Sequence, residues 1–532
     1  MFNVRAFPRQ ILYFSWFLVL VLFLSACSSN EGHKDHPADL DPGNVLRIDL
    51  NHNYGSFTPQ MLDCAGSTCV FPFIYSYLCV PDTAGELQPD LATAWDYDPR
   101  TFTWQIRLRD DARFHNGDPV TAVDAADSIL AISNNREKGL GRKIKFARAI
   151  DDYLLEIRLK NDDPSFLESI WDMEIFQDPG RQATPNPNDS PAGSGPFTLV
   201  DHTADGRVIL AANENYYNGR PALDRVIFYY IPDREASWVR LIKGETDIAG
   251  DLAVEDYKII EQYADRFYFS KVLYPYYTIL LYNTHHPLFE NPMVRRALTH
   301  AIDRDYMVQT MMNGLARVTA GPMGNESLWH DPDLNPLPYD PPLALALLKK
   351  AGWTPDPQTR CLMKNGKCFE FELLLATGSE TGLKLARYIQ LCLNDIGIRV
   401  HLTALPNDKL IDRYFQNTAF QAVLTSLSTY GRRPEQALSL WVTMDEKRST
   451  AGGFDSPEAA RLARLAMDAK DPATRQMYFQ QFDRLIAGLA PGSFLFQKTY
   501  IDAMSKRFAL KYPFSFEVYG LHRLQYARLK NE

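Results

Sequence analysis

Residues 87–130 decide the fold and read LQPDLATAWDYDPRTFTWQIRLRDDARFHNGDPVTAVDAADSIL. Apolar side chains alternate along the middle of this stretch, at Phe102, Trp104, Ile106 and Leu108. Such alternation predicts a half-buried β-strand. The pair Asn116-Gly117 predicts a tight turn, and Thr121 with Asp124 forms the Thr-x-x-Asp pattern of a capped helix start. The stretch therefore predicts a turn, two strands, a second tight turn and a helix, and nothing in it indicates catalysis.

The same region carries two sequence patterns at fixed spacing. The first, G-x-L-x-P-x-L-A-x-x-W, runs from Gly85 to Trp95, and the second, L-R-x-x-x-x-F-H-x-G-x-P-x-T-A-x-D, runs from Leu108 to Asp124. Both resemble patterns of the bacterial extracellular solute-binding proteins of family 5, which serve peptide and nickel importers of the ABC type. Further segments resemble the same family, at 193–197 (GSGPF), 213–219 (NENYYNG), 244–248 (GETDI), 294–303 (VRRALTHAID) and 339–353 (YDPPLALALLKKAGW).

The resemblance implies an α/β periplasmic-binding-protein fold of type II, in its large three-domain variant, with a hinge and an interlobe ligand cleft. It also implies that separate segments of the chain build each lobe. Lobe 1 is expected to contain residues 44–84, 193–280 and 499–532, with an accessory domain at 85–192, and lobe 2 to contain residues 281–498. Alternating strand and helix patterns from Phe369 to Thr403 agree with mixed α/β lobes.

Residues 1–26 have the layout of a secretory signal peptide. Arg5 and Arg9 precede an uncharged apolar run from Ile11 to Leu24, which is shorter than the about 20 residues of a transmembrane helix. The order Leu24-Ser25-Ala26-Cys27 resembles the bacterial lipobox, which implies a lipid attached to Cys27. Residues 27–43 are polar and predict a flexible tether. An uncleaved anchor helix is the alternative, and both interpretations place the body at the periplasmic or extracellular face of a bacterial membrane.

Charge and motifs exclude several classes of function. The formal net charge is −9 without a long Lys/Arg run, so nucleic acid is not expected as a partner. The sequence contains no G-x-S-x-G elbow, H-E-x-x-H helix or Gly-rich phosphate loop. We therefore expect neither an enzyme nor a cofactor, and we expect a monomer.

Two cysteines flank a predicted hairpin. Cys361 and Cys368 stand on either side of Lys364-Asn365-Gly366-Lys367, whose central pair is a strong turn signal. Because the hairpin brings the two sulfur atoms within bonding reach, we expect a disulfide, which an oxidising exterior permits.

The remaining body cysteines leave alternatives open. Cys64 and Cys69 are close enough in sequence to pair, whereas Cys79 and Cys392 are expected as buried thiols. A zinc site is the other interpretation, but C-x-x-C spacing and a suitably placed His are both absent. No metal site is therefore expected.

The segment expected to contact the ligand departs from the family pattern. Peptide-binding members commonly carry A-D-Y-x-x-P, whose Asp pairs with the free amine of the peptide. Alignment on Pro434 places Tyr430 where this Asp would stand, with Arg432 and Arg433 beside it. The departure suits a carboxylate, a phosphate-bearing group or an uncharged ligand better than an amine. A shifted loop with arginines in solvent is the alternative.

Aromatic and histidine side chains supply further candidates. Tyr54, at the end of the first predicted strand, and Trp441 fit the lining of an apolar cleft, and each fits a buried core as well. The pair His285-His286 fits a structural turn, or a metal-chelate site near the cleft.

The sequence thus predicts a lipid-anchored substrate-binding protein of an ABC importer. Its ligands are expected to be oligopeptides or peptide-like solutes, which it delivers to the permease subunits. A carrier of a nickel chelate, haem or another non-peptide solute is the first alternative. A signalling or adhesive lipoprotein that kept the fold is the second.

Overall fold

The computed structural model describes residues 44–55, 57–59, 65–82, 86–135, 138–177, 192–203, 206–252, 254–416, 420–429, 437–443, 450–469, 471–514 and 518–530. By its contacts the chain divides into residues 1–45 and residues 46–532, and nearly all described residues belong to the second unit. The predicted signal peptide, Cys27 and the tether lie outside the described residues. Among the residues that are described, no helix is both long and apolar enough to cross a bilayer.

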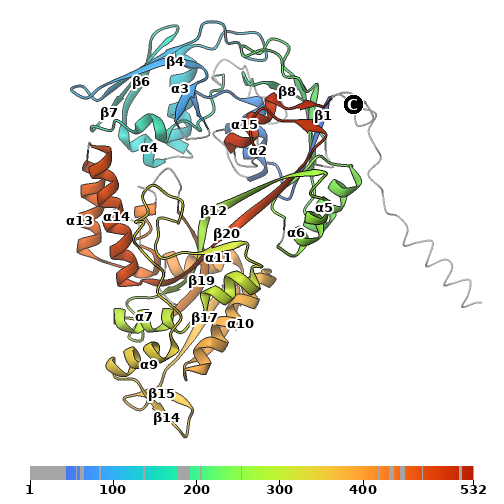
Figure 1. Cartoon of the computed structure of the whole chain (residues 1–532). Helices are drawn as coiled ribbons and strands as arrows, with labels where there is room; N and C mark the ends of the chain where they lie inside the picture. Colours follow the sequence, from blue (N-terminus) through green and yellow to red (C-terminus); the bar gives the residue numbers. More distant parts are fainter. Residues whose placement is uncertain are drawn as a thin grey trace, which may run out of the picture. The chain divides into compact units, whose positions relative to one another are not determined.

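One large mixed sheet forms the centre of the second unit (Figure 1). Within the described residues its strands follow the order β18-β17-β19-β12-β20-β11-β1-β10-β9-β8, and β13 pairs with β20 off this path. The strands are β1 (Val45–Leu50), β8 (Phe197–His202), β9 (Arg207–Ala212), β10 (Arg225–Tyr230), β11 (Ile248–Ala249), β12 (Phe267–Tyr282), β13 (Ala316–Val318), β17 (Glu370–Ala376), β18 (Arg399–Leu405), β19 (Ala422–Ser428) and β20 (Gly492–Ser505). The alternating sequence VLRIDLN at 45–51, which predicts the first strand, corresponds to β1.

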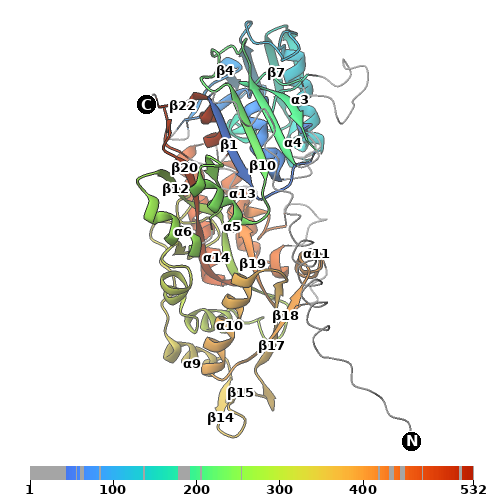
Figure 2. The ribbon, with the colours of Figure 1, turned by 90° about the vertical axis from the view of Figure 1, so that its right-hand side faces the viewer.

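Two long strands connect the two halves of this sheet. β12 and β20 pair antiparallel, from Phe267 opposite Ser505 to Leu281 opposite Gly492. At one end β20 pairs with β11, and at the other end β12 pairs with β19. β12 and β20 therefore belong to both lobes, and Figures 1 and 2 show them passing from the upper half to the lower half.

Lobe 1 surrounds the β8–β11 half of the sheet. Its helices are α2 (Ala65–Ile74), α5 (Arg234–Lys243), α6 (Val254–Ile260) and α15 (Val518–Arg523). Short strand pairs complete it: β2 (Cys79–Pro81) with β3 (Leu87–Pro89), and β21 (Phe508–Ala509) with β22 (Arg528–Leu529). The C-terminal segment thus packs in lobe 1 although lobe 2 precedes it in the chain.

The stretch at 87–130 builds much of a separate four-stranded sheet. This sheet has the order β4 (Ala92–Asp98), β5 (Thr103–Leu108), β7 (Leu154–Leu159), β6 (Ile144–Asp151), and α3 (Ala122–Asn135) and α4 (Lys138–Lys143) accompany it. Trp104, Ile106 and Leu108 are buried, as their alternation predicts. Asp124 accepts hydrogen bonds from the backbone and the hydroxyl of Thr121, so the predicted cap is confirmed.

Lobe 2 has a parallel sheet buried on both faces. Leu373 and Leu375 of β17 pack in one apolar cluster and Leu374 packs in another, as expected of a central parallel strand. The helices of the lobe are α7 (Pro292–His300), α8 (Arg304–Tyr306), α9 (Pro341–Lys350), α10 (Glu380–Asp395), α11 (Asn407–Ile411), α13 (Pro457–Asp468) and α14 (Pro472–Leu489). The strand, helix and strand predicted between 369 and 403 correspond to β17, α10 and β18.

A small three-stranded sheet projects from lobe 2. Its strands are β14 (Thr354–Asp356), β15 (Cys361–Lys364) and β16 (Lys367–Cys368). Asn365 and Gly366 both have positive φ, 51° and 72°, as a two-residue turn that matches the twist of its strands requires. A disulfide joins Cys361 and Cys368, whose Cα atoms are 5.8 Å apart.

Candidate functional site

Lobe 1 presents polar side chains where its parallel strands end. β1 and β11 are parallel, with Ile48 opposite Ile248. The segments that follow these strands carry Asn51 and Asp251, and Asn51 Nδ2 donates to Asp251 Oδ2 at 3.4 Å. Arg234, the first residue of α5, forms an ion pair with the same oxygen. In α/β sheets the carboxyl ends of the strands are the usual place for ligands.

Asp251 has an unusual backbone conformation. Its φ is 52°, in the left-handed region that non-glycine residues seldom occupy. Its amide donates to Asp502 Oδ1 at 2.9 Å, which holds the residue against β20. Asp251 Oδ1 is buried and makes no hydrogen bond to any part of the chain that the structure describes. Such strain is commonly found at binding sites.

The pairing of β12 with β20 is interrupted where the two strands pass between the lobes. Leu273 pairs with Thr499 and Tyr277 pairs with Gln497, so three residues of β12 stand opposite one of β20. β20 is buried toward both ends and partly exposed at 498–500. A break in a ladder makes it a natural place for a hinge.

Three tyrosine rings stack at this break. The Tyr274 ring lies 3.9 Å from the Tyr500 ring and 4.8 Å from the Tyr276 ring, measured between centroids. Lys498 Nζ lies 5.3 Å from the centroid of Tyr500. Burial raises the pKa of the Tyr500 phenol, and the nearby Asp251 carboxylate raises it further. The phenol therefore stays protonated and can donate a hydrogen bond.

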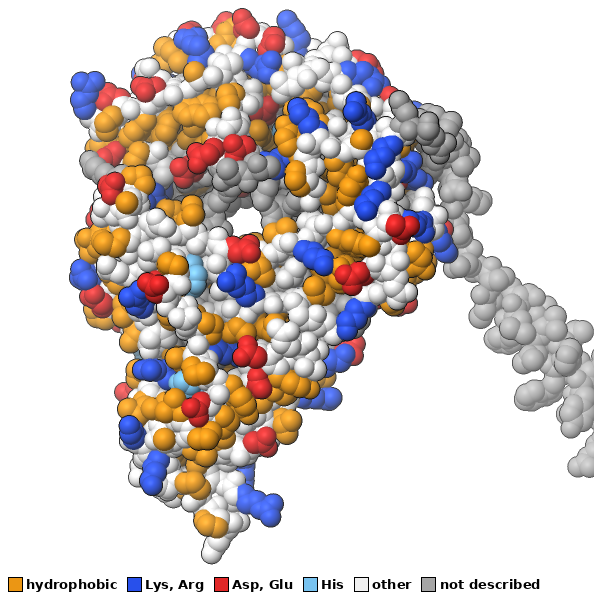
Figure 3. Space-filling view, in the orientation of Figure 1, with side chains coloured by type: hydrophobic (Ala, Val, Ile, Leu, Met, Phe, Trp, Pro, Cys, Tyr) orange, Lys and Arg blue, Asp and Glu red, His pale blue; other side chains and the backbone are white. Residues whose placement is uncertain are grey.

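Lobe 2 brings the carboxyl end of β19 to the same break. β17 runs parallel to both β18 and β19, so the three carboxyl ends share one edge. Ser428, the last residue of β19, stands opposite Tyr276, and Thr429 N donates to the Pro275 carbonyl at 2.8 Å. Figure 3 shows an opening between lobe 1 with the accessory sheet above and lobe 2 below. This arrangement can hold a solute between two lobes that move about the break.

The segment that follows β7 in the accessory domain contacts lobe 2 at a second place. Arg475 of α14 donates from Nη1 to Ser165 Oγ at 2.7 Å, across a separation of 310 residues. The same guanidinium lies 5.5 Å from the centroid of the Trp329 ring. A change in the relative position of the lobes would have to break or form this contact.

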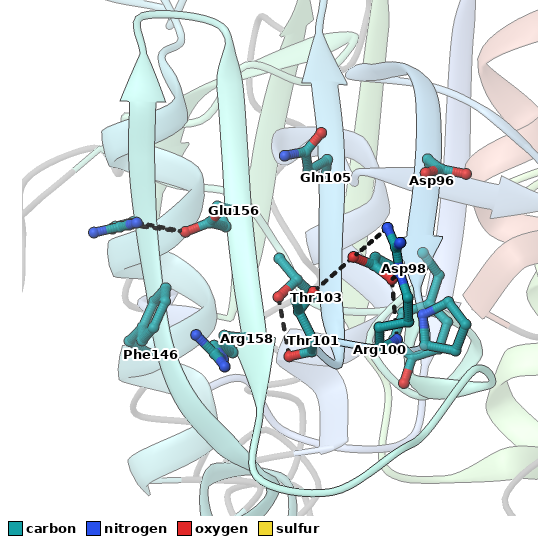
Figure 4. Close-up of a pocket in the computed structure, with 12 residues that line it drawn as sticks. Asp96, Asp98, Arg100, Thr101, Thr103, Gln105, Phe146, Glu156 and Arg158 are labelled. Atoms are coloured by element: carbon teal, nitrogen blue, oxygen red, sulfur yellow. Dashed lines mark hydrogen bonds and ion pairs between the residues drawn. The ribbon is translucent and has the colours of Figure 1, made fainter.

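The hollow drawn in Figure 4 lies elsewhere. It is an open depression of about 590 Å³ on the accessory sheet, lined among others by Asp98, Arg100, Arg148 and Glu156. Four of its charged groups already pair with each other, Arg100 with Asp98 at 3.1 Å and Arg148 with Glu156 at 2.8 Å. It lies on a different sheet from the hinge strands, so we do not assign the solute site to it.

The two aromatic residues proposed from sequence are buried. Tyr54 lies just after β1, as expected, but only 7% of it is exposed, and its ring packs against Phe57 and His202. Trp441 is fully buried in lobe 2 between Phe454 and Phe494. The structure therefore places Trp441 in the core and not at the cleft. Tyr430, Arg432 and Arg433 lie outside the described residues.

The histidine pair lies away from the hinge. His285 and His286 follow the far end of β12, and Tyr282 is about 20 Å along the strand from Tyr276 at about 3.4 Å per residue. The His286 ring accepts a hydrogen bond from Leu288 N and contacts the Gln421 amide, as in a structural turn. Among the described residues, no group of three His, Cys, Asp or Glu side chains is arranged to hold a metal.

Several residues at the hinge were missed from sequence. None of the sequence patterns that indicate a ligand site includes Arg234, Asp251, Lys498 or Tyr500. Asp251 stands four residues after Asp247 of the GETDI segment, so its position after a short strand was the available signal. The other three converge only through strand pairing between distant segments.

Comparison with known proteins agrees with this architecture. Residues 86–449 match the family of bacterial extracellular solute-binding proteins, family 5, over its middle region. The chain belongs to this family. It is 25% identical to the oligopeptide-binding protein AppA of Bacillus subtilis over 91% of this chain and 93% of that protein. It is 28% identical to the nickel-binding periplasmic protein of Escherichia coli over 71% and 73% of the two chains.

A solved structure shows the same fold. The crystal structure of NikA from Brucella suis in complex with Fe(III)-EDTA superposes with a TM-score of 0.81 and 19% identity. The alignment covers 91% of this chain and all of that one. The two-lobed α/β fold is therefore the fold of the family 5 solute-binding proteins, which are transport proteins of the periplasm or cell exterior.

Proposed function

We propose that this protein is the substrate-binding subunit of an ABC importer and that it captures peptides or peptide-like solutes between its lobes. One observation carries the proposal: β1 and β11 of lobe 1 and β19 of lobe 2 end beside the break between β12 and β20, and the carboxyl ends of β17 and β18 point the same way as that of β19. A solute bound there contacts both lobes, so its binding energy favours the closed arrangement. The closed protein then delivers the solute to the permease subunits.

Peptides are the preferred ligand class for two reasons. Of the two relatives given above, AppA is matched over the larger share of this chain, and its name states oligopeptide binding. The hinge also combines aromatic rings with charged and amide side chains, which suits a flexible solute with apolar and polar parts. A nickel chelate is the second candidate, because a nickel-binding protein is among the relatives.

The body is proposed to be anchored by lipid at Cys27 and to act as a monomer. Cleavage before Cys27 would leave residues 27–43 as a polar tether between the lipid and lobe 1. A tether keeps the binding protein near the membrane without fixing its orientation toward the permease. Two or more acyl chains are required for stable attachment, at about 0.8 kcal/mol per buried CH₂.

Native mass spectrometry of protein purified without denaturation tests the ligand class. A co-purified mass distribution of short peptides would support the proposal, whereas a single metal-chelate mass would support the second candidate. Small-angle scattering tests the closing motion, because a bound solute should lower the radius of gyration. Absence of any ligand-dependent change across peptide, chelate and sugar panels would overturn the transport role.

A further inference from the structure

The partly exposed part of β20 places a cation and an aromatic ring on one face. Side chains two residues apart on a strand point to the same side, so Lys498, Tyr500 and Asp502 share a face. The distance of 5.3 Å from Lys498 Nζ to the Tyr500 ring agrees with this placement. Tyr274 covers Tyr500 from the neighbouring strand.

A second cation is fixed over the same face. The Asp251 amide donates to Asp502, which places Asp251 on the side of β20 that carries Tyr500. Arg234 pairs with the Asp251 carboxylate, which Asn51 also contacts. Arg234 is thereby held by Asp251, which Asn51 and Asp502 contact in turn. The Arg234 side chain is still 45% exposed.

The charges are arranged by depth. The side chain of Asp251 is 13% exposed and Asp502 is 6% exposed, so both carboxylates lie beneath the surface. Arg234 carries the opposite charge at the solvent side, where its side chain is 45% exposed, and Lys498 is partly exposed. Of these four charged side chains Arg234 is the most exposed, so a solute that reaches this face meets a positive charge first.

We propose that Arg234 and Lys498 bind a carboxylate of the solute beside Tyr500 at the hinge. This inference rests on the proposed function and narrows its ligand class to carboxylate-bearing peptides. The guanidinium offers paired donors that match the two oxygens of a carboxylate. Because Asp251 already fixes the guanidinium, less side-chain freedom is lost when the solute binds. The Tyr500 hydroxyl supplies a further donor.

The test uses the mature protein and mixtures of short random peptides without Asp or Glu. One mixture has free C-terminal carboxylates, a second has C-terminal amides, and a third has C-terminal amides with Glu added to the composition. Apparent affinities are measured by native mass spectrometry titration. We expect the free acids to bind about tenfold or more tightly than the amides, if the terminal carboxylate is recognised. Recovery of affinity in the third mixture would instead assign recognition to a side-chain carboxylate.

The double variant R234Q/K498Q should lose about tenfold or more in affinity for the carboxylate form and keep its affinity for the amides. Retained amide binding also shows that the variant is folded. The matched control is R461Q/K384Q, since Arg461 and Lys384 form exposed ion pairs on α13 and α10. The control should leave both affinities unchanged.

Three results would overturn the inference in distinguishable ways. Equal binding of all three mixtures to the parent protein would refute carboxylate recognition but leave peptide transport intact. An equal loss for acids and amides in R234Q/K498Q would show that these residues are only structural. No binding of any peptide by the parent would overturn the proposed function and the inference together.

Discussion

Arg507 and Asp247 form a two-point ion pair, with Arg507 Nε 2.6 Å from Asp247 Oδ1 and Nη2 2.7 Å from Oδ2. Arg47 donates to the same carboxylate from its backbone amide at 2.9 Å and from Nε at 3.2 Å. The three residues come from the start, middle and end of the body. Asp247, in the GETDI segment, therefore joins the separate chain segments that build lobe 1.

Replacement of Asp247 by Asn should destabilise lobe 1. The carboxylate is 2% exposed, and its loss leaves the Arg47 and Arg507 cations with weaker partners. We expect the free energy of unfolding to fall by about 3 kcal/mol, less than for a fully buried pair because both arginines are partly exposed. Chemical denaturation measures the change. Glu245→Gln is the control, since this exposed neighbour should alter stability by no more than about 0.5 kcal/mol.

Loss of the Cys361–Cys368 disulfide should reduce stability moderately. The bond closes a short loop of sequence separation 7, for which chain entropy predicts about 2 to 3 kcal/mol. The double variant Cys361→Ala/Cys368→Ala should therefore melt at a lower temperature than the parent under oxidising conditions. Addition of a reductant should lower the melting temperature of the parent but not that of the variant. Equal melting of both proteins would contradict a stabilising bond.

Acidification should destabilise the protein through buried histidines. Burial lowers the pKa of His115 and of His522, so both stay neutral in the folded state at a pH where the unfolded chain binds protons. The unfolded state then holds more protons below about pH 6.5, and the free energy of unfolding falls as the pH falls. Denaturation at several pH values measures this slope. His115→Gln/His522→Gln should flatten it, whereas His401→Gln, at an exposed site, should not.

Removal of the Arg475 side chain should shift the lobes apart. Its hydrogen bond to Ser165 joins α14 to the segment that follows β7 in the accessory domain, and a bond of this kind contributes about 1 kcal/mol. Arg475→Ala should therefore raise the radius of gyration of the unliganded protein and weaken solute binding by about fivefold. Small-angle scattering and titration measure both effects. Arg461→Ala, on the neighbouring helix, is the control.

The lipid anchor should be separable from solute capture. If Cys27 carries the lipid, Cys27→Ser should yield a protein released from membranes that binds solute with unchanged affinity. Membrane fractionation and native mass spectrometry of the released protein measure the two properties. Retention in the membrane fraction would favour the uncleaved anchor helix, and loss of solute binding would show that anchor and body depend on each other.

Much of the fold follows from local patterns in the sequence. The alternation at 104–108, the Thr121–Asp124 cap and the Asn365-Gly366 turn each fix a short segment through interactions within that segment. The glycine in the GSGPF segment is required by a tertiary contact. A Cβ on Gly195 would lie 2.5 Å from the Ile74 carbonyl carbon, so only glycine lets α2 approach this segment. Sequence indicated that this segment resembles the family, but not what it packs against.

The candidate site was less predictable. An aromatic residue such as Trp441 is typical of a ligand contact, but the Trp441 ring packs against Phe454 and Phe494 in the core. Sequence could not separate the two roles, since an aromatic ring suits a core equally well. Arg234 and Lys498 have no pattern in common and are 264 positions apart by their numbers. Their proximity depends on Asp251, Asp502 and the pairing of β11 with β20.

The sequence by itself indicated the family through motifs at fixed spacing, and the resemblance to that family implied the class of fold. Periodicity and turn residues predicted individual elements, such as the strands and helix within 87–130 and the hairpin at 361–368. The tertiary structure decided which side chains meet at the hinge. β19 of lobe 2 and the β1–β11 pair of lobe 1 end beside the same break in the β12–β20 ladder. That convergence depends on contacts between residues hundreds of positions apart. Local patterns along the chain do not indicate which of these distant residues pack together.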